Sequence, residues 1–239
     1  MIRLVSLDLW ETLIKDEGEG ERGRDELRAD FIIKTLGLQS SYKDQIMAFF
    51  DELVEAFKHP SIENEWSVLP ETQIDHLLQR IGVNAKKEDF KKILSYYTEC
   101  ILDYPPVFAE KEVPEVLENL KKKYKVALIS NTGRTPGRIL LKLLENMRIA
   151  KYFDFFAFSD ELLLRKPDPA IFGIACSKMD TLPEESVHIG DSYNMDYLGA
   201  KAARVNPILY IPYNERPKAE VYIKSLVEIE DKIKEAYEN

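Results

Sequence analysis

Cysteine and histidine are scarce in this 239-residue chain, and their spacing excludes several kinds of site. The two cysteines, Cys100 and Cys176, lie far apart in the sequence, so neither a disulfide framework nor a zinc ribbon is available. The three histidines, His59, His76 and His188, show no HExxH or other metal-ligand spacing. A zinc-dependent enzyme is therefore excluded.

Long hydrophobic runs and an excess of positive charge are also missing. No apolar run approaches the roughly 18 residues of a membrane helix, and the first residues do not read as a signal peptide. The chain has 33 Lys and Arg against 42 Asp and Glu, a net charge of −9, which disfavours nucleic acid and anionic membranes as partners. With 45% hydrophobic and 31% charged residues, we expect a soluble cytoplasmic protein, a monomer or homodimer.

Short apolar segments alternate with helical patterns along most of the chain. The segments have the length and low charge of buried parallel strands: Leu4–Leu9, Lys125–Ile129, Phe155–Phe158, Val187–Ile189 and Ile208–Ile211. Apolar residues at helical spacing predict helices over Val113–Lys123, Pro136–Met147, Pro169–Met179, Met195–Arg204 and Lys218–Tyr237. This alternation predicts an α/β fold with a doubly wound, mostly parallel, Rossmann-like sheet.

Residues 16–103 break this alternation, because their apolar residues recur only at helical spacing. The sequence therefore predicts that residues 1–15 and 104–239 form an α/β core and that residues 16–103 form an inserted all-helical cap domain. Ligands of open α/β sheets bind at the C-terminal edge of the strands, so we expect the cap above that edge. The glycines of Gly18–Gly23 match a dinucleotide fingerprint, but they begin several residues after the strand, so we interpret them as a charged linker.

Two of the predicted strands end in polar residues that could carry chemistry. Asp8 ends the first strand, where a carboxylate can act as a nucleophile or metal ligand, although Asp8 and Glu11 also match a helix capping box. Ser130 and Asn131 end the second predicted strand. They could donate hydrogen bonds to phosphate oxygens or only form the turn before the next helix.

Two further motifs supply charge. Lys166 lies just outside a helix that starts at Asp168, and a lysine there is usually a solvated surface charge. Asp191 and Asp196 follow the strand that ends at Gly190, and either could be only a helix cap. On one continuous helix the two carboxylates would lie about 140° apart. They converge if Asp191 lies on the loop and Asp196 opens the helix.

These charged residues meet if the strands form one parallel sheet, because the C-terminal ends then share an edge. The carboxylates of Asp8, Asp191 and Asp196 would raise one another's pKa, and a hard divalent cation such as Mg²⁺ would offset their charge. With Mg²⁺ and Lys166 the charges sum to zero. Such a site could bind a phosphate and leave Asp8 ionised, which predicts phosphoryl transfer through an aspartyl-phosphate.

The order of these motifs resembles the haloacid dehalogenase superfamily, whose members are aspartate-nucleophile hydrolases. The helical insert is similar to that family's cap. The matching residues span the whole predicted sheet domain and are Asp8…Thr12, Ser130-Asn131, Lys166-Pro167 and Gly190-Asp191…Asp196.

The resemblance implies a role for each residue that contacts the substrate. Asp8 would be the nucleophile and a Mg²⁺ ligand. Ser130, helped by Asn131, would hydrogen-bond the transferring phosphoryl group of a small phosphorylated metabolite. Lys166 would neutralise charge on the nucleophile and the phosphate.

The resemblance also implies a set of residues around the metal. Asp191 would bind Mg²⁺ directly, and Asp196 would bind it through water or hold Lys166. Thr12 would orient the first loop. Trp10 would contribute its backbone carbonyl, although phosphatases of this family usually carry a second aspartate at this position, which acts as general acid.

The loss of that acid at Trp10 leaves alternatives open. Glu11, a cap residue or water could supply the proton, or the substrate could have a good leaving group, as acyl and anomeric phosphates do. Dehalogenases of the family also lack this aspartate and need no metal, but they generally replace the acid found here at Asp191. The phosphatase is therefore the preferred reading over a 2-haloacid dehalogenase or a catalytically idle binding module.

Overall fold

A computed structural model of the chain describes residues 1–58, 69–212 and 218–238, and these fall into two compact units. The first unit comprises residues 1–15, 107–131 and 144–239. The second comprises residues 16–106 together with residues 132–143. Besides the predicted insert, the second unit therefore contains a short segment that directly follows Asn131.

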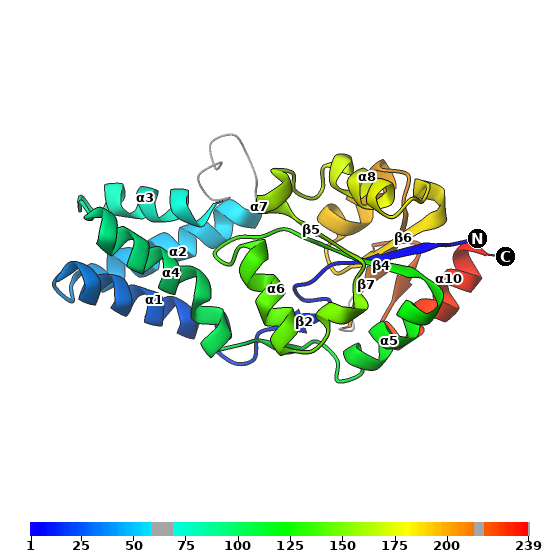
Figure 1. The fold of residues 1–239 in the computed structure, drawn as a ribbon, viewed down its shortest axis with the longest axis horizontal. Coiled ribbons are helices and arrows are strands. Elements are labelled where there is room, and N and C mark those ends of the chain that lie inside the picture. Colours follow the sequence, from blue (N-terminus) through cyan, green and yellow to red (C-terminus); the bar gives the residue numbers. More distant parts are fainter. Residues whose placement is uncertain (59–68, 213–217, 239) are drawn as a thin grey trace. The chain divides into compact units, whose positions relative to one another are not determined.

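Six of the described strands form one parallel sheet in the first unit (Figure 1). Their order is β5-β4-β1-β6-β7-β8, so β4 and β5 lie on one side of β1 and β6, β7 and β8 lie on the other. The strands are β1 (Leu4–Leu7), β4 (Lys125–Ser130), β5 (Phe155–Phe158), β6 (Ser186–Gly190), β7 (Asn206–Tyr210) and β8 (Tyr222–Ile223). The order reverses at β1, which is where open α/β sheets bind their ligands, and the predicted doubly wound α/β class is confirmed.

Helices cover both faces of this sheet (Figure 1). On one face, α8 (Pro169–Lys178) and α9 (Gly199–Ala202) pack with strand residues in a continuous apolar cluster. The opposite face is covered by α5 (Val113–Lys123) and α10 (Ile229–Tyr237). All four residues of β1 are buried, because a strand covered on both faces needs apolar side chains on each.

The C-terminal stretch differs from the single helix predicted over Lys218–Tyr237. β8 pairs with the end of β7, and α10 begins only at Ile229 after a 3-10 turn (η5, Leu226–Glu228). A capping box at Ser225 precedes this turn. The helical prediction is wrong here because a strand next to β7 satisfies that strand's backbone groups, a gain that periodicity does not reveal.

Short elements connect these parts. A two-stranded antiparallel sheet joins β2 and β3, at the points where the chain first leaves the first unit and first re-enters it. The bounds of the two strands are Ile14–Lys15 (β2) and Val107–Phe108 (β3). The other described elements are α6 (Gly137–Asn146), α7 (Ser159–Leu162), η2 (Ala150–Tyr152), η3 (Pro183–Glu185) and η4 (Tyr193–Leu198).

The second unit is built mainly from α1 (Gly20–Leu36), α2 (Tyr42–Lys58), α3 (Pro70–Arg80) and α4 (Lys87–Asp103). Their apolar faces form one core around residues that include Ile32, Phe50, Leu77 and Tyr97. The interpretation of Gly18–Gly23 as a linker is wrong in part, because α1 already begins at Gly20. Gly37 ends α1 with a φ of +63°, a conformation that glycine adopts without strain.

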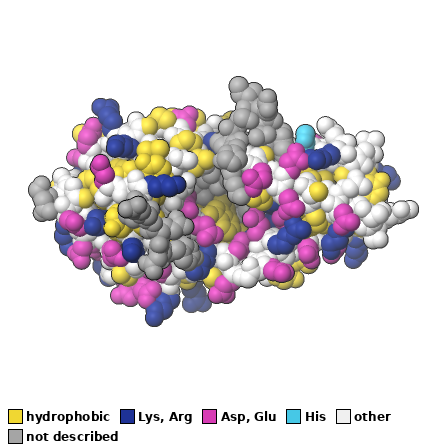
Figure 2. Space-filling model, turned by 180° about the vertical axis from the view of Figure 1, so that it is seen from behind, with side chains coloured by type: hydrophobic (Ala, Val, Ile, Leu, Met, Phe, Trp, Pro, Cys, Tyr) yellow, Lys and Arg dark blue, Asp and Glu magenta, His cyan; other side chains and the backbone are white. Residues whose placement is uncertain are grey.

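Charged side chains of both signs are interspersed on the face of the molecule shown in Figure 2. On this face, the described residues therefore offer nucleic acid no uniformly basic surface. Within the described parts of the chain, no helix combines the length and apolar character that a membrane crossing requires.

A buried ion cluster joins α1 to the segment after Asn131 inside the second unit. Asp25 accepts hydrogen bonds from Arg28 at 2.8 Å and from Arg134 at 3.0 Å. Arg134 also donates to Glu21 and to the carbonyl oxygen of Phe50. Because a buried charge without a partner is strongly destabilising, Asp25 holds these two guanidinium groups in place.

We expect Asp25→Asn to lower the free energy of unfolding by about 3 kcal/mol, because two buried guanidinium groups would lose their shared anion. Asp51→Asn is the matched control, since Asp51 pairs with Arg22 on the surface and should change the free energy by less than about 1 kcal/mol. Urea unfolding followed by circular dichroism measures both. Equal effects of the two substitutions would contradict the structural importance of the cluster.

Candidate active site

The Lys166 ammonium lies between two buried carboxylates at the C-terminal edge of the sheet. Its Nζ donates to Oδ1 of Asp8 and to Oδ1 of Asp196, each at 2.5 Å. All three residues are buried. Asp8 directly follows β1, and Asp196 lies in η4 after β6. The structure therefore brings together three predicted site residues from distant parts of the sequence.

Asp191 completes a cluster of three carboxylates. Asp8, Asp191 and Asp196 each offer an oxygen, and these oxygens lie within 4.8 Å of one another. The Thr12 hydroxyl lies 3.5 Å from Oδ2 of Asp8 and 3.4 Å from Oδ1 of Asp191, so its single proton can serve either carboxylate. A donor set made only of carboxylate oxygens suits a hard divalent cation, so these residues fit such an ion.

Asp196 reaches this cluster because the helix after β6 opens with a wide turn. The Tyr197 N–H bonds to the Ser192 carbonyl, five residues back, in a π-helix (η4). π-Helical turns of this kind are often found at functional sites. The predicted continuous helix from Met195 is therefore wrong in detail, since α9 begins only at Gly199.

Gly190, the last residue of β6, leaves the space that the Asp196 carboxyl group occupies. A Cβ atom built on Gly190 would lie 2.3 Å from Cγ of Asp196, closer than two carbon atoms can approach. The convergence of Asp191 and Asp196 therefore depends on a residue without a side chain at position 190.

Asn131 contacts the backbone of Lys166. Its Nδ2 donates to the Lys166 carbonyl oxygen at 2.9 Å, and its Oδ1 accepts the Lys166 N–H at 2.8 Å. Ser130 is fully buried at the end of β4, beside β1, and its hydroxyl has a weak contact of 3.4 Å with the Asn131 carbonyl oxygen. Asn131 thus orients Lys166, while contact of Ser130 and Asn131 with a phosphoryl group stays a prediction.

Trp10, at the position of the missing acid, and its neighbour Glu11 have different environments in the structure. Trp10 is half-buried and forms one backbone bridge with Ile14. Glu11 has a φ of +56°, in the left-handed region that favours glycine, and lines a cavity of about 310 Å³ with Lys15 and Glu110. No carboxylate of the aspartate cluster is among the residues that line this cavity. The metal contact of the Trp10 carbonyl stays a prediction.

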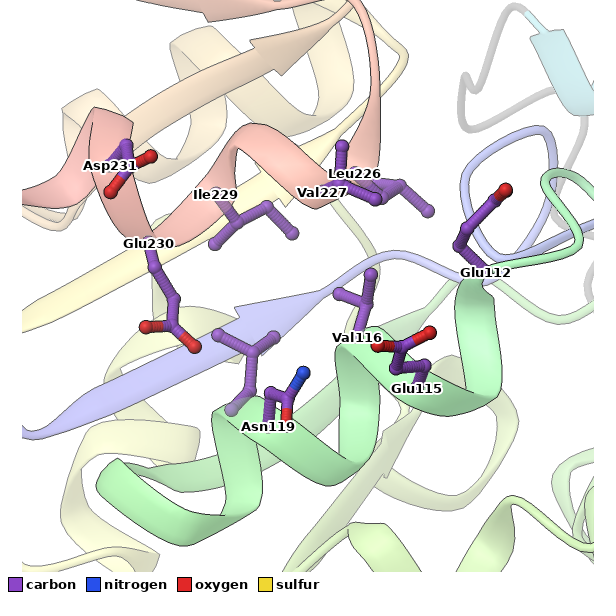
Figure 3. Close-up of a pocket in the computed structure, with 10 residues that line it drawn as sticks. Glu112, Glu115, Val116, Asn119, Leu226, Val227, Ile229, Glu230 and Asp231 are labelled. Carbon is purple, nitrogen blue, oxygen red and sulfur yellow. The ribbon is translucent and has the colours of Figure 1, made fainter.

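Another cavity, of about 260 Å³, lies between α5 and the residues at the start of α10 (Figure 3). Its walls carry Glu112, Glu115, Glu230 and Asp231 around apolar side chains that include Val116. These carboxylates would repel an anionic substrate, and none of the predicted site residues lines the cavity. The candidate site is therefore the aspartate cluster and not this cavity.

Burial and neighbouring charges shift the pKa values within the cluster. Burial raises the pKa of Asp8 to about 6, although Lys166 acts in the opposite direction. Burial, with the nearby Asp8 and Asp196, raises the pKa of Asp191 to about 8. Burial also acts to raise the pKa of Asp196, but Lys166 and His188 outweigh it and hold that pKa well below its usual range.

Lys166 stays protonated in this environment. Burial lowers the pKa of its ammonium, but the charges of Asp196 and Asp8 outweigh burial and raise the pKa above its usual value. One ammonium among three carboxylates leaves an excess of negative charge, which a divalent cation would offset.

His188 is a site residue that sequence reasoning missed. It lies on β6, is buried, and places Nε2 3.0 Å from Oδ1 of Asp196. Burial lowers the pKa of its imidazole. The sequence held one signal for it, since His188 comes two residues before Gly190 and therefore shares its face of the strand.

Comparisons with known proteins agree with this geometry. A family model described as haloacid dehalogenase-like hydrolase matches residues 2–204. The chain is 23% identical to N-acylneuraminate-9-phosphatase of Rattus norvegicus, over 95% of the chain and 92% of that protein. It is 35% identical to phosphoglycolate phosphatase 1 of Pseudomonas aeruginosa, over 56% of the chain and 49% of that protein.

A solved structure with a similar fold carries the name of a different enzyme activity. The crystal structure of 2-haloacid dehalogenase from Pseudomonas syringae pv. Tomato aligns with a TM-score of 0.71 and 23% identity, over 98% of this chain and 99% of that one. Phosphatases and a dehalogenase are thus both similar to the chain, and the site residues must distinguish the two activities.

We expect the stability of the metal-free protein to fall as the pH rises from about 4 to about 8. In this range the folded state holds a proton on Asp191, whose pKa is raised from 3.8 to about 8, while the unfolded chain has lost it. The folded state therefore binds more protons, and increasing pH favours unfolding. Asp191→Asn should then be more stable than the parent at about pH 8.5 and similar to it at about pH 4.

Thermal unfolding in excess EDTA at the two pH values measures this difference. Asp231→Asn, a change at an exposed side chain, serves as the control and should match the parent at both. A metal-free Asp191→Asn protein no more stable than the parent at the higher pH would contradict the raised pKa.

Proposed function

Because the chain belongs to the haloacid dehalogenase-like hydrolases, we propose that it is a Mg²⁺-dependent phosphatase that hydrolyses a small phosphorylated metabolite. The observation that carries this proposal is the Lys166 ammonium bonded to Asp8 and Asp196 beside Asp191. The phosphatase names of relatives that align with the chain support the same reaction class.

In the first step, Asp8 attacks the phosphorus atom of the substrate. One carboxylate oxygen of Asp8 forms the new bond to phosphorus, while Lys166 donates a hydrogen bond to Oδ1 of the same carboxylate. The bond between phosphorus and the leaving oxygen breaks, and that oxygen either takes a proton from Glu11, a cap residue or water, or leaves as a stable anion. Lys166 favours the ionised form of Asp8 and offsets charge on the phosphoryl group during the transfer.

In the second step, water attacks the phosphorus atom of the aspartyl-phosphate. The bond from phosphorus to Asp8 breaks, inorganic phosphate leaves, and the Asp8 carboxylate is restored. Ser130, at the adjacent strand end, would donate a hydrogen bond to the phosphoryl oxygens, and Asn131 keeps Lys166 in place.

Asp8, Asp191 and the Trp10 carbonyl would hold Mg²⁺. Asp196 would bind the ion through water or hold Lys166. When bound, the ion would neutralise carboxylate charge and orient phosphate oxygens. Of the two roles implied for Asp196, its contacts favour holding Lys166, because both carboxylate oxygens already accept hydrogen bonds from the protein.

A metal-independent 2-haloacid dehalogenase is the second candidate, and Trp10 is the observation that favours it. Asp191 supports the phosphatase instead, because attack on carbon without a metal has no use for a third carboxylate beside Asp8. The same retained set of charged residues argues against a catalytically idle binding module.

The remaining features of the proposal come from the sequence. We infer that the second unit acts as a cap that selects the substrate, with residues 16–103 as its insert. The stretch from His59 to Trp66, for which the sequence leaves open a contact with the substrate or an ordinary loop between helices, lies outside the described residues. The cytoplasmic location and the monomeric or homodimeric state stay predictions.

We expect the purified protein to hydrolyse an aryl phosphate with Mg²⁺ and to lose this activity in excess EDTA. Asp8→Asn removes the nucleophile and should lower kcat by at least about 10³-fold, whereas Asp231→Asn should keep kcat within about twofold of the parent. A continuous phosphate-release assay measures all three proteins. Hydrolysis that persists in Asp8→Asn, or dehalogenation of a 2-haloacid without metal, would contradict the proposal.

The missing acid generates a separate prediction. Trp10→Asp should raise kcat for alkyl phosphates, which need protonation of the leaving group, by about tenfold or more, because a general acid is worth about 10²–10⁴-fold. Aryl phosphates, whose leaving groups are stable anions, should gain little. Trp10→Phe is the control for loss of the indole ring. An alkyl phosphate rate raised less than about twofold would mean that another group already supplies the proton.

A further inference from the structure

His188 has both ring nitrogens engaged inside the first unit. Nδ1 lies 2.9 Å from the Ser6 hydroxyl oxygen, and Nε2 lies 3.0 Å from Oδ1 of Asp196. An ionised carboxylate only accepts hydrogen bonds, so Nε2 carries the hydrogen. The Ser6 hydroxyl proton is then shared between Nδ1 of the neutral ring and the Val187 carbonyl oxygen, which lies 3.1 Å from the hydroxyl oxygen. The ring also meets Phe172 edge-on, with 4.9 Å between the ring centres, so it has little freedom to turn.

The Asp196 carboxylate is held by three donors. Oδ1 accepts from His188 and from Lys166, while Oδ2 accepts the backbone N–H of Ser192 at 3.0 Å. Of the two donors to Oδ1, Lys166 has a long flexible side chain, whereas the His188 ring is fixed on a strand. The position of Oδ1 therefore depends on His188.

The contacts form a path that begins on β1 and ends at Asp8, the residue directly after β1. Ser6 pairs with His188 in the parallel register of β1 and β6. From His188 the path continues through Asp196 and Lys166 to Asp8, which lies two residues after Ser6. Because strand pairing fixes both ends of the path, the groups between them have defined positions.

We propose that His188 is a positioning residue, which holds Asp196 so that the Lys166 ammonium bonds Asp196 and Asp8 at the same time. Without the Nε2 donor, Lys166 is the one donor left to Oδ1 of Asp196 among the described residues, while the Ser192 N–H still holds Oδ2. The carboxylate can then rotate about Oδ2 and carry the ammonium away from Asp8. A shift of about 1 Å in a catalytic group can lower a rate by about 10²-fold.

The first test uses metal-free protein and needs no enzymatic activity. His188→Leu removes the donor at similar side-chain volume, and His188→Gln retains an amide donor toward Asp196. Ser186→Ala is the matched control, because Ser186 is buried on the same face of β6 and its hydroxyl contacts Cys176, Thr181 and Leu182, which are not part of the aspartate cluster. Acetylation of Lys166 by acetic anhydride, followed by mass spectrometry, reports how firmly the ammonium is held.

We expect His188→Leu to speed Lys166 acetylation by at least about threefold, since local opening exposes the amine more often. His188→Gln and Ser186→Ala should stay within about twofold of the parent. Unchanged acetylation in folded His188→Leu would overturn the proposal. If His188→Leu does not fold, His188→Asn takes its place, because its shorter amide extends toward Ser6 and not to Asp196. Equal acetylation of the Asn and Gln variants would then overturn it.

The second test rests on the proposed phosphatase function. His188→Leu should lower kcat for an aryl phosphate by about tenfold and leave KM within about twofold, while His188→Gln should recover at least half of the parent kcat. A kcat of folded His188→Leu equal to that of the parent would overturn the proposal. Acetylation that changes as expected in a protein without phosphatase activity would support the positioning role and overturn the proposed function instead.

Discussion

The site depends on one buried ammonium group that is shared by two carboxylates. Lys166 bonds Asp8 and Asp196 at 2.5 Å each, and a buried lysine is tolerated only where such partners offset the loss of hydration. Neighbouring residues position the groups of this interaction. Asn131 fixes the backbone of Lys166 through two hydrogen bonds, and the bare backbone of Gly190 leaves room for the Asp196 carboxyl group.

The parallel sheet explains how one lysine can reach both acids. In the order β5-β4-β1-β6-β7-β8, the strands that carry Asp8, Ser130 and the Asp191 loop are neighbours, and their C-terminal ends share one edge. After β1 the chain enters the second unit at residue 16, once β2 has formed, and after β4 it enters that unit at residue 132. Within that unit, Arg134 is tied to Asp25 of α1, so the segment after Asn131 packs with the helices rather than with the sheet.

The charge of the site is the basis for proposing a phosphatase rather than a dehalogenase. Asp8 alone could attack either carbon or phosphorus. Asp191 adds a third carboxyl group, and burial with the nearby Asp8 and Asp196 raises its pKa to about 8, so its ionised form is unfavourable unless a cation offsets the charge. A site that holds a cation next to a nucleophile suits a phosphate ester. Trp10, in place of an acid, limits the choice of leaving group and leaves this preference unchanged.

The amino-acid sequence by itself determined the α/β class, because apolar periodicity is a local feature. It also predicted a helical insert and named Asp8, Lys166, Asp191 and Asp196 as candidate site residues from their places at strand ends. Only the tertiary structure decided which side chains pair. It assigned Asn131 to the backbone of Lys166 and His188 to Asp196, opened the helix after Asp191 as a π-helix, and added β8 to the sheet. These outcomes depend on contacts between segments far apart in the chain, where register and burial outweigh local preference, and no short stretch of sequence records them.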